Sequence, residues 1–407
     1  MAEPLVTIVT PTLNQGHFIR STIESVLSQD YPNIEYIVMD GGSTDQTAAV
    51  VQDYASRLTW ISERDRGQSH AINKGFRIAR GQIVAWLNSD DLLLPGAVRK
   101  AVGACQANPQ AGAIYGEGYL IDRNGETIGR FPCTEAFNLW KLVHLSDYIL
   151  QQTVFFKKRV LDEIGDIRED LHYAMDWDLL IRIGKRYPLH YIPEYLGCLR
   201  EYSEAKSSSG GRKRIREIAG VLRQHTGQRF PPGYINYGLD SYRRLWCEAI
   251  DSRTPALLKR PSTVIQRWIS IMCGLLIDRA IHHSQGWYSD KWASRRVKLM
   301  LPAVPGTLVL EGILPDLGPA VRVQTITITV GGDFLKQVKF GPGPFRMEVP
   351  LQPHSPEPIH VELMAKKFVM AAGTDRRKLC YLLNDVRVEP EELGTNLSMS
   401  HVIHSTA

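Results

Sequence analysis

The residues best suited to chemistry are Asn88, Ser89, Asp90 and Asp91, which directly follow the apolar run 82–87. This run predicts a buried strand, at whose end two adjacent carboxylates repel each other and lose hydration. A hard divalent ion such as Mg²⁺ or Mn²⁺, bridging to a bound diphosphate, would supply the missing positive charge. A helix start capped by Asp90 or Asp91 fits the same residues about as well, so this segment alone leaves both interpretations open.

Two further segments follow predicted strands in the first half of the chain. The strand 5–10 leads into a turn at 11–16, and the strand 35–39 ends at Asp40. The two glycines after Asp40 let a ligand approach the backbone, and its carboxylate can accept a hydrogen bond from a base or ribose. An ordinary turn aspartate is the alternative.

Strand and helix periodicity alternate over the first 130 or so residues. This βαβαβαβ order predicts a parallel sheet with helices on its faces, and hence an α/β fold. Ligands of such sheets bind beyond the carboxyl ends of the strands, so we expect the polar loops to converge there. The predicted strands are 5–10, 35–39, 58–61 and 82–87, and the predicted helices are 18–27, 44–54, 69–79 and a segment opened by Pro95.

Two other segments carry polar side chains with chemical potential. The run 65–75 feeds a predicted helix N-terminus, an anion site with Arg66 and Lys74 nearby, although a capped helix with a solvated basic face fits too. Asp176 precedes an apolar helix and suits a general base, with Trp177 as a platform for a sugar ring. A capping aspartate beside a core tryptophan explains this second segment at least as well.

The rest of the chain has a different character. A hairpin is predicted around 123–125, and helical periodicity runs from Arg212 to about Met300. Beyond Pro305, short alternating strands with Gly and Pro turns predict a small β-sandwich. The predicted domains are residues 1–210, a helical connector at 211–304 and a β-sandwich at 305–407.

Composition narrows the class of protein. With 407 residues the chain exceeds one ordinary core, and a net charge of +5 is too small to indicate a nucleic-acid partner. The six cysteines are scattered without metal or redox spacing, which together with the absence of a secretory pattern predicts a cytoplasmic protein. No apolar run reaches the roughly 20 residues of a membrane span. The basic run 212–216 and the apolar run 268–277 leave a peripheral contact with the inner membrane face open, although a solvated helix face and a helix packed between the domains explain the two runs better.

Four segments, in this order, resemble the signatures of the family 2 glycosyltransferases with a GT-A fold. They are Thr7 to Asn14, Val38 to Asp45, Asn88 to Asp91, and Asp176 to Leu179. The resemblance covers roughly residues 4–210, and four motifs in order and spacing are far more specific than any one of them.

The resemblance implies an inverting transfer of a sugar from a UDP- or GDP-sugar to a glycan or lipid-linked acceptor. It implies that Asp176 is the base and that Asp90, with Asp91 sharing the role, holds Mn²⁺ or Mg²⁺. Trp177 and Asp178 are expected to meet the acceptor. A role in surface polysaccharide synthesis follows by family analogy alone. The residues expected at the nucleotide are Pro11, Thr12, Asn14, Asp40, Arg66, Gly67, Asn73, Asn88 and Ser89.

Three positions depart from the family pattern. Asn88 replaces the first aspartate of the DxD element, and Met175 stands where many relatives have glutamate. Tyr202 stands where many members place a metal-binding histidine, which predicts a weaker metal site or a third ligand elsewhere.

Two other functions compete with glycosyl transfer. A nucleotidyltransferase shares the metal–diphosphate chemistry, but the chain lacks a Gly-rich, Lys/Arg-dense triphosphate loop. A glycan-binding scaffold with a degenerate transferase domain gains support from Met175 and Asn88, whereas the retained Asp90 and Asp176 argue against it.

Overall fold

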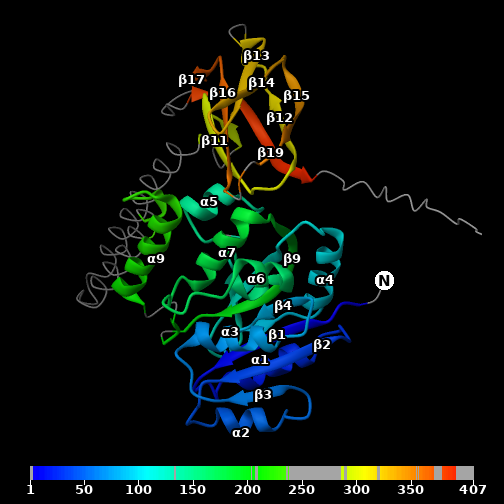
Figure 1. The fold of residues 1–407 in the computed structure, drawn as a ribbon, viewed down its shortest axis with the longest axis vertical. Coiled ribbons are helices and arrows are strands. Elements are labelled where there is room, and N and C mark those ends of the chain that lie inside the picture. The colour runs from blue at the N-terminus through cyan, green and yellow to red at the C-terminus, as the bar shows by residue number, and fades with distance from the viewer. Residues whose placement is uncertain are drawn as a thin grey trace, which may run out of the picture.

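The structure is a computed structural model that describes residues 3–132, 134–202, 204–206, 210–234, 237, 286–287, 291–318, 321–353, 355, 357–370 and 378–390. An α/β part formed by the first half of the chain carries a β-rich part from the C-terminal third at one end (Figure 1). Helix α5 contacts strand β11 where the two parts meet, and Ala303 N–H donates to the carbonyl of Lys185 at 3.2 Å.

A nine-stranded sheet forms the centre of the α/β part, in the order β3-β2-β1-β4-β8-β6-β9-β5, with β7 paired to β6. The first four strands are parallel to one another, β8 runs antiparallel to both neighbours, and β6 and β9 are parallel. The strands are β1 (Val6–Thr12), β2 (Ile34–Asp40), β3 (Thr59–Ser62), β4 (Ile83–Trp86), β5 (Leu92–Leu93), β6 (Ala113–Ile121), β7 (Thr127–Arg130), β8 (Phe155–Lys157) and β9 (Leu189–Arg200).

Helices cover both faces of this sheet (Figure 1). They are α1 (Ile19–Leu27), α2 (Thr47–Gln52), α3 (Gln68–Ile78), α4 (Ala97–Ala107), α5 (Leu139–His144), the 3₁₀ turn η1 (Gln151–Thr153), α6 (Lys158–Ile164), α7 (Met175–Arg186) and α9 (Gly211–Thr226). The predicted α/β fold and the hairpin at 123–125, formed by β6 and β7, are confirmed.

The central strands are buried on both faces, because alternate side chains enter two different cores. In β1, Ile8 packs against the layer of α1 and α4, whereas Val9 packs against the layer of α3, α5 and α7. Helix α3 lies very close to β1: a Cβ added at Gly75 would stand 2.4 Å from Cγ1 of Val9. This close approach fixes the start of α3 near the carboxyl ends of the parallel strands.

Two antiparallel four-stranded sheets, β10-β19-β12-β15 and β11-β16-β13-β14, form the C-terminal part. They enclose an apolar core that includes Leu310, Ile326 and Leu363, so the predicted β-sandwich is confirmed. The strands are β10 (Trp292–Ala293), β11 (Arg296–Leu301), β12 (Gly306–Leu314), β13 (Gln324–Val330), β14 (Asp333–Phe340), β15 (Gly343–Leu351), β16 (Ile359–Ala365) and β19 (Tyr381–Pro390), with a small hairpin of β17 (Val369–Met370) and β18 (Lys378–Leu379).

Some predicted elements differ from the structure. The helical periodicity predicted up to Met300 is wrong from residue 292 onward, since β10 and β11 lie there and pair with β19 and β16. Val297 and Leu299 are buried on either side of the exposed Lys298, which is strand alternation. Strand β1 also continues through Pro11 and Thr12 into the predicted turn, because its pairing with β2 extends to Asp40.

Within the predicted connector 211–304, α9 is helical, most residues after 237 lie outside the described ones, and 291–304 contain β10 and β11.

Candidate functional site

The ends of β1, β2 and β4 lie side by side because these strands are parallel neighbours. Hydrogen bonds join the loops after β1 and β2: Asn14 Oδ1 accepts from Thr44 N at 2.8 Å, and Gly16 N donates to Asp45 at 3.0 Å. Helix α1 ties in the third loop, since the Thr22 hydroxyl donates to the carbonyl of Ser89 at 2.9 Å. The expected convergence of the three loops is confirmed.

The predicted nucleoside residues form a buried corner between β1 and β2. Asp40 is 2% exposed and accepts from Ser43 N at 3.0 Å and from the Ser62 hydroxyl at 2.6 Å. Pro11 is buried next to it. The Thr12 hydroxyl is buried without a hydrogen-bond partner in the structure, an arrangement that carries a free-energy cost unless a ligand satisfies it.

Other predicted nucleotide residues are spread more widely. Arg66 is largely exposed and pairs with Glu169 at 2.6 Å, while Gly67 precedes α3 with a φ of 124°. Asn73 is buried, and its amide exchanges two hydrogen bonds with the backbone of Ile167, at 2.8 and 2.9 Å. Because both ends of this amide are occupied, Asn73 anchors the loop before α7, and its contacts give no support to the prediction that it binds the nucleotide.

The two aspartates of the 88–91 loop have different environments. Asp91 is 1% exposed, and both of its oxygens accept hydrogen bonds: Oδ1 from Arg200 N at 2.9 Å, and Oδ2 from Gln152 at 2.6 Å and Asn88 at 3.0 Å. Burial and the charge of Asp90 raise the pKa of Asp91 to about 7. Since its oxygens already have partners, we correct the prediction that Asp91 shares the metal.

Asp90 is partly exposed, and its Oδ2 accepts a hydrogen bond of 2.8 Å from the Tyr202 hydroxyl. Burial raises the pKa of the Asp90 carboxyl, while the bond from Tyr202 lowers it. Within the described residues, no group of three or more His, Cys, Asp or Glu side chains could hold a metal ion. One carboxylate of this kind fits a Mg²⁺ or Mn²⁺ ion that takes most of its oxygen ligands from a diphosphate and water.

Asp176 lies in the first turn of α7, and its Oδ1 accepts a hydrogen bond of 2.8 Å from Trp177 N. Burial raises the pKa of Asp176, against the lowering effect of Lys206 and Arg214. Asp147, in the loop after α5, has its pKa raised by burial and by the charge of Asp176. A carboxyl with a raised pKa accepts a proton more readily than an ordinary aspartate, which suits a general base.

Trp177 and Asp178 pack inside the protein. Trp177 is 2% exposed and its indole N–H donates to the carbonyl of Leu142 at 2.8 Å. Asp178 is fully buried and pairs with Arg182 at 2.8 Å and His225 at 2.9 Å. We therefore correct the prediction that these side chains bind the acceptor, because α7 turns both of them away from solvent.

Residues that the sequence did not single out hold the site together. Glu217 of α9 accepts hydrogen bonds from three consecutive backbone N–H groups, those of His172, Tyr173 and Ala174, and so fixes the start of α7. No local pattern distinguishes this glutamate from any other on an amphipathic helix, so the sequence offers no signal that could have found it.

A series of hydrogen-bonded side chains crosses the site from the 88–91 loop toward Asp176. Gln68, the first residue of α3, donates to Asn88 Oδ1 at 2.6 Å, and Lys206 donates to Gln68 Oε1 at 2.6 Å. The Lys206 ammonium interacts electrostatically with Asp176. The loop after β4 and the start of α7 are thereby parts of one site.

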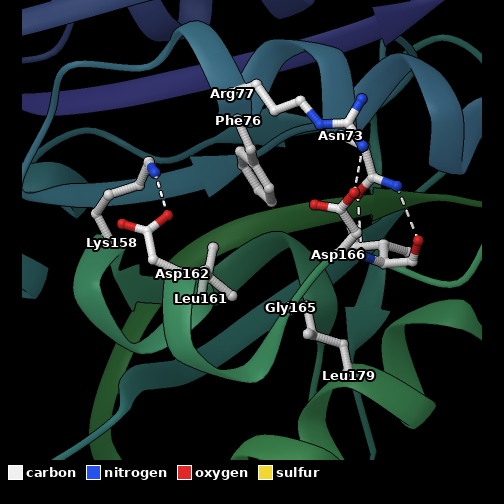
Figure 2. A pocket seen from close by; sticks show the side chains of 10 residues that line it. Asn73, Phe76, Arg77, Lys158, Leu161, Asp162, Gly165, Asp166 and Leu179 are labelled. Atoms are coloured by element: carbon white, nitrogen blue, oxygen red, sulfur yellow. Dashed lines mark hydrogen bonds and ion pairs between the residues drawn. The ribbon is translucent and has the colours of Figure 1, made fainter.

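A cavity of about 170 Å³ lies between the later turns of α3 and helix α6, and Asn73 is the one predicted nucleotide residue among those that line it (Figure 2). Its basic side chains have carboxylate partners: Arg77 pairs with Asp166, and Lys158 pairs with Asp162. The cavity therefore offers little free charge to an anion.

The model of the family described as glycosyl transferase family 2 matches residues 7–159. This span contains three of the four motifs found in the sequence, at the strand ends where the structure has them. Over these residues the chain is therefore similar to the family 2 glycosyltransferases. The α/β part has helices on both faces of a sheet whose parallel strands end at the site (Figure 1).

Two relatives with functional names are much longer than the region they share with this chain. The chain is 29% identical to a chondroitin synthase of Escherichia coli over 192 residues, which is 46% of this chain and 28% of the relative. It is 29% identical to the O-antigen biosynthesis protein RfbC of Myxococcus xanthus over 230 residues, 54% of this chain and 18% of the relative. The chain thus spans less than a third of either protein.

Among solved structures, TarS 1–349 of S. aureus in complex with UDP-GlcNAc is 17% identical with a TM-score of 0.44, over 64% of this chain and 79% of that one. The mannosyltransferase PcManGT from Pyrobaculum calidifontis, in complex with GDP-Man and Mn²⁺, is 20% identical with a TM-score of 0.45. The match covers 69% of this chain and 87% of that one.

The part of the chain that the structure describes contains no helix long and apolar enough to cross a membrane. The basic run 212–216 lies in α9, and the apolar run 268–277 lies outside the described residues. The peripheral membrane contact and the cytoplasmic location remain predictions.

Proposed function

We propose that this protein is an inverting glycosyltransferase that uses a UDP- or GDP-sugar and builds a surface polysaccharide or lipid-linked glycan. The observation that carries the proposal is a series of hydrogen bonds between the side chains of Asn88, Gln68 and Lys206. It joins the loop of Asp90 to the neighbourhood of Asp176. A carboxylate that can hold a divalent ion for the diphosphate and a base with a raised pKa, in one site, are what a single displacement requires. The polysaccharide role draws support from the chondroitin synthase and O-antigen relatives.

In this proposal the nucleoside lies in the corner of Pro11, Thr12 and Asp40, with Asn14 and Ser89 on the flanking loops. A Mn²⁺ or Mg²⁺ ion held by Asp90 would stabilise the charge that develops on the leaving diphosphate. Asp176, with Oδ1 held by Trp177 N–H, uses its other oxygen to take the proton of the acceptor hydroxyl. The hydroxyl oxygen attacks the anomeric carbon from the face opposite the diphosphate, so the configuration inverts.

Calorimetric titration with UDP and GDP, each with Mn²⁺ and with EDTA, tests the donor site. We expect one nucleotide to bind and Mn²⁺ to strengthen its binding in the wild type but not in Asp90→Asn. Asp91→Asn is the matched control, since its amide would face the donor groups of Gln152 and Arg200 and should lower thermal stability. Failure of both nucleotides to bind under either condition would favour the scaffold function.

Thr12→Val tests the nucleoside corner separately. Valine keeps the shape of the side chain but removes the unpartnered hydroxyl, so we expect the melting temperature to stay the same or rise. If the hydroxyl bonds the nucleoside, the affinity for the nucleotide should fall about 2- to 10-fold, the value of one neutral hydrogen bond. Thr10→Val is the contrast, because the Thr10 hydroxyl bonds Tyr36 at 3.1 Å and its loss should lower stability. Unchanged nucleotide affinity in Thr12→Val would remove Thr12 from the site.

A further inference from the structure

Lys206 brings a half-buried positive charge into the proposed site. Its ammonium donates to Gln68, which in turn donates to Asn88, each at 2.6 Å. Asn88 precedes Asp90 by two residues. The Gln68 side chain therefore links the ammonium to the loop that carries Asp90, the proposed metal ligand. Burial lowers the pKa of Lys206, whereas the charges of Asp176 and Glu217 raise it. Hydration is thus partly lost here, and an anionic ligand would compensate for the loss.

Three other basic side chains around the site, those of Arg66, Lys74 and Arg200, already have partners. Arg66 pairs with Glu169 at 2.6 Å, and Lys74 pairs with Glu63 at 2.8 Å. Arg200 is 3% exposed and donates to backbone carbonyls, among them that of Asp90 at 2.7 Å. In the region that the structure describes, the hydrogen bond of the Lys206 ammonium goes to a neutral amide, which leaves further N–H groups for a ligand.

The hydrogen-bond partner of Asp90 is Tyr202, which supplies no positive charge for a diphosphate. The Tyr202 hydroxyl donates a hydrogen bond to Asp90. The Tyr202 ring packs on the Phe18 ring, with the two centroids 5.0 Å apart. A phenol that donates a hydrogen bond to the carboxylate is neither an anionic nor an imidazole ligand, so the described residues supply few metal ligands at this position.

We propose that Lys206 binds the diphosphate of the nucleotide sugar directly, so that nucleotide binding by this chain survives removal of the divalent ion. The proposal rests on the proposed function and adds a donor-binding residue to it. A lysine ammonium is an effective point charge for phosphate, and a fixed cation can stabilise the charge of a departing diphosphate. The alternative is that Lys206 serves only as the counter-ion of Asp176 on the acceptor side.

Calorimetry in EDTA separates these roles, with UDP, GDP, uridine and guanosine as probes. We expect the wild type to bind one nucleoside diphosphate without metal, and Lys206→Met to bind it about 10- to 100-fold more weakly, the range for hydrogen bonds to charged groups. Affinity for the matching nucleoside should not change, because it carries no phosphate. Lys206→Arg should retain most of the affinity. Lys298→Met, an exposed lysine of β11, controls for the change in net charge.

Each other result has a distinct meaning. A wild type that binds neither nucleotide, with or without Mn²⁺, contradicts the proposed function itself. Binding that requires Mn²⁺, or equal diphosphate affinity in wild type and Lys206→Met, overturns the role of Lys206 and leaves the function standing. Equal losses for nucleoside and diphosphate also overturn it, since the side chain would then only support the shape of the site. Melting temperatures check the fold, and Lys206→Gln, which can still bond Gln68, replaces the methionine variant if that variant unfolds.

Discussion

Replacing Asp176 by asparagine is expected to lower the rate of sugar transfer by roughly 10²–10⁴-fold, the contribution of a general base, without changing nucleotide affinity. The amide oxygen can still accept the hydrogen bond from Trp177 N, so the start of α7 should keep its shape. Burial raises the pKa of Asp176, which means that folding favours the protonated carboxyl. The neutral asparagine should therefore leave the melting temperature unchanged or raise it.

The pH dependence of the wild-type rate checks the same assignment. A base works only in its ionised form, so kcat/KM should fall as the pH drops through the folded-state pKa of Asp176. Because that pKa is raised, the fall should begin above the range of an ordinary aspartate, whose pKa is about 3.9. Product formation can be followed by release of the nucleoside diphosphate. An Asp176→Asn protein that transfers sugar at the wild-type rate would show that the base lies elsewhere.

Replacing Asp178 by asparagine, two residues further along α7, is expected to destabilise the protein by about 3–5 kcal/mol. The Asp178 carboxylate is fully buried and pairs with Arg182 at 2.8 Å and His225 at 2.9 Å, with Arg168 at 3.6 Å. Loss of its charge leaves these basic groups partly buried without their partner. Denaturant unfolding of the two proteins near pH 7 measures the difference.

The stability difference should depend on pH in a defined direction. Burial tends to raise the pKa of Asp178, but hydrogen bonds from His225 and Arg182 outweigh it, and the pKa is lowered overall. Stability from such a group is present above the unfolded pKa of about 3.9 and is lost as the pH falls through the lowered folded pKa. The difference between wild type and variant should therefore shrink in acid.

Asp170→Asn is the matched control for Asp178. Asp170 pairs with the same Arg168, at 2.5 Å, but its side chain is 66% exposed, so we expect a loss of less than about 1 kcal/mol. Equal effects of the two substitutions would mean that burial of the Asp178 cluster contributes nothing. Together, Asp176→Asn and Asp178→Asn should separate activity from stability within three residues of one helix.

The sequence predicted the α/β order and the convergence of three loops because both follow from local patterns. The short apolar runs of β1 and β2, and the helix period after each of them, are patterns that extend over a few residues. Parallel pairing then brings the strand ends, and Asp40 and Asp90 with them, to one edge of the sheet. The same reasoning failed at 292–300, where β10 and β11 form through pairing with strands β19 and β16.

By itself, the sequence determined which residue types end the strands and which four segments resemble the family. Only the tertiary structure decided what each side chain does. It buries Asp91, Trp177 and Asp178, and it brings Lys206 to Gln68 across 138 positions of the chain. The physical reason is that hydrogen bonds, desolvation and charge depend on neighbours in space. A carboxylate or an ammonium carries no local mark of whether packing will give it a partner, leave it in water or keep it for a ligand.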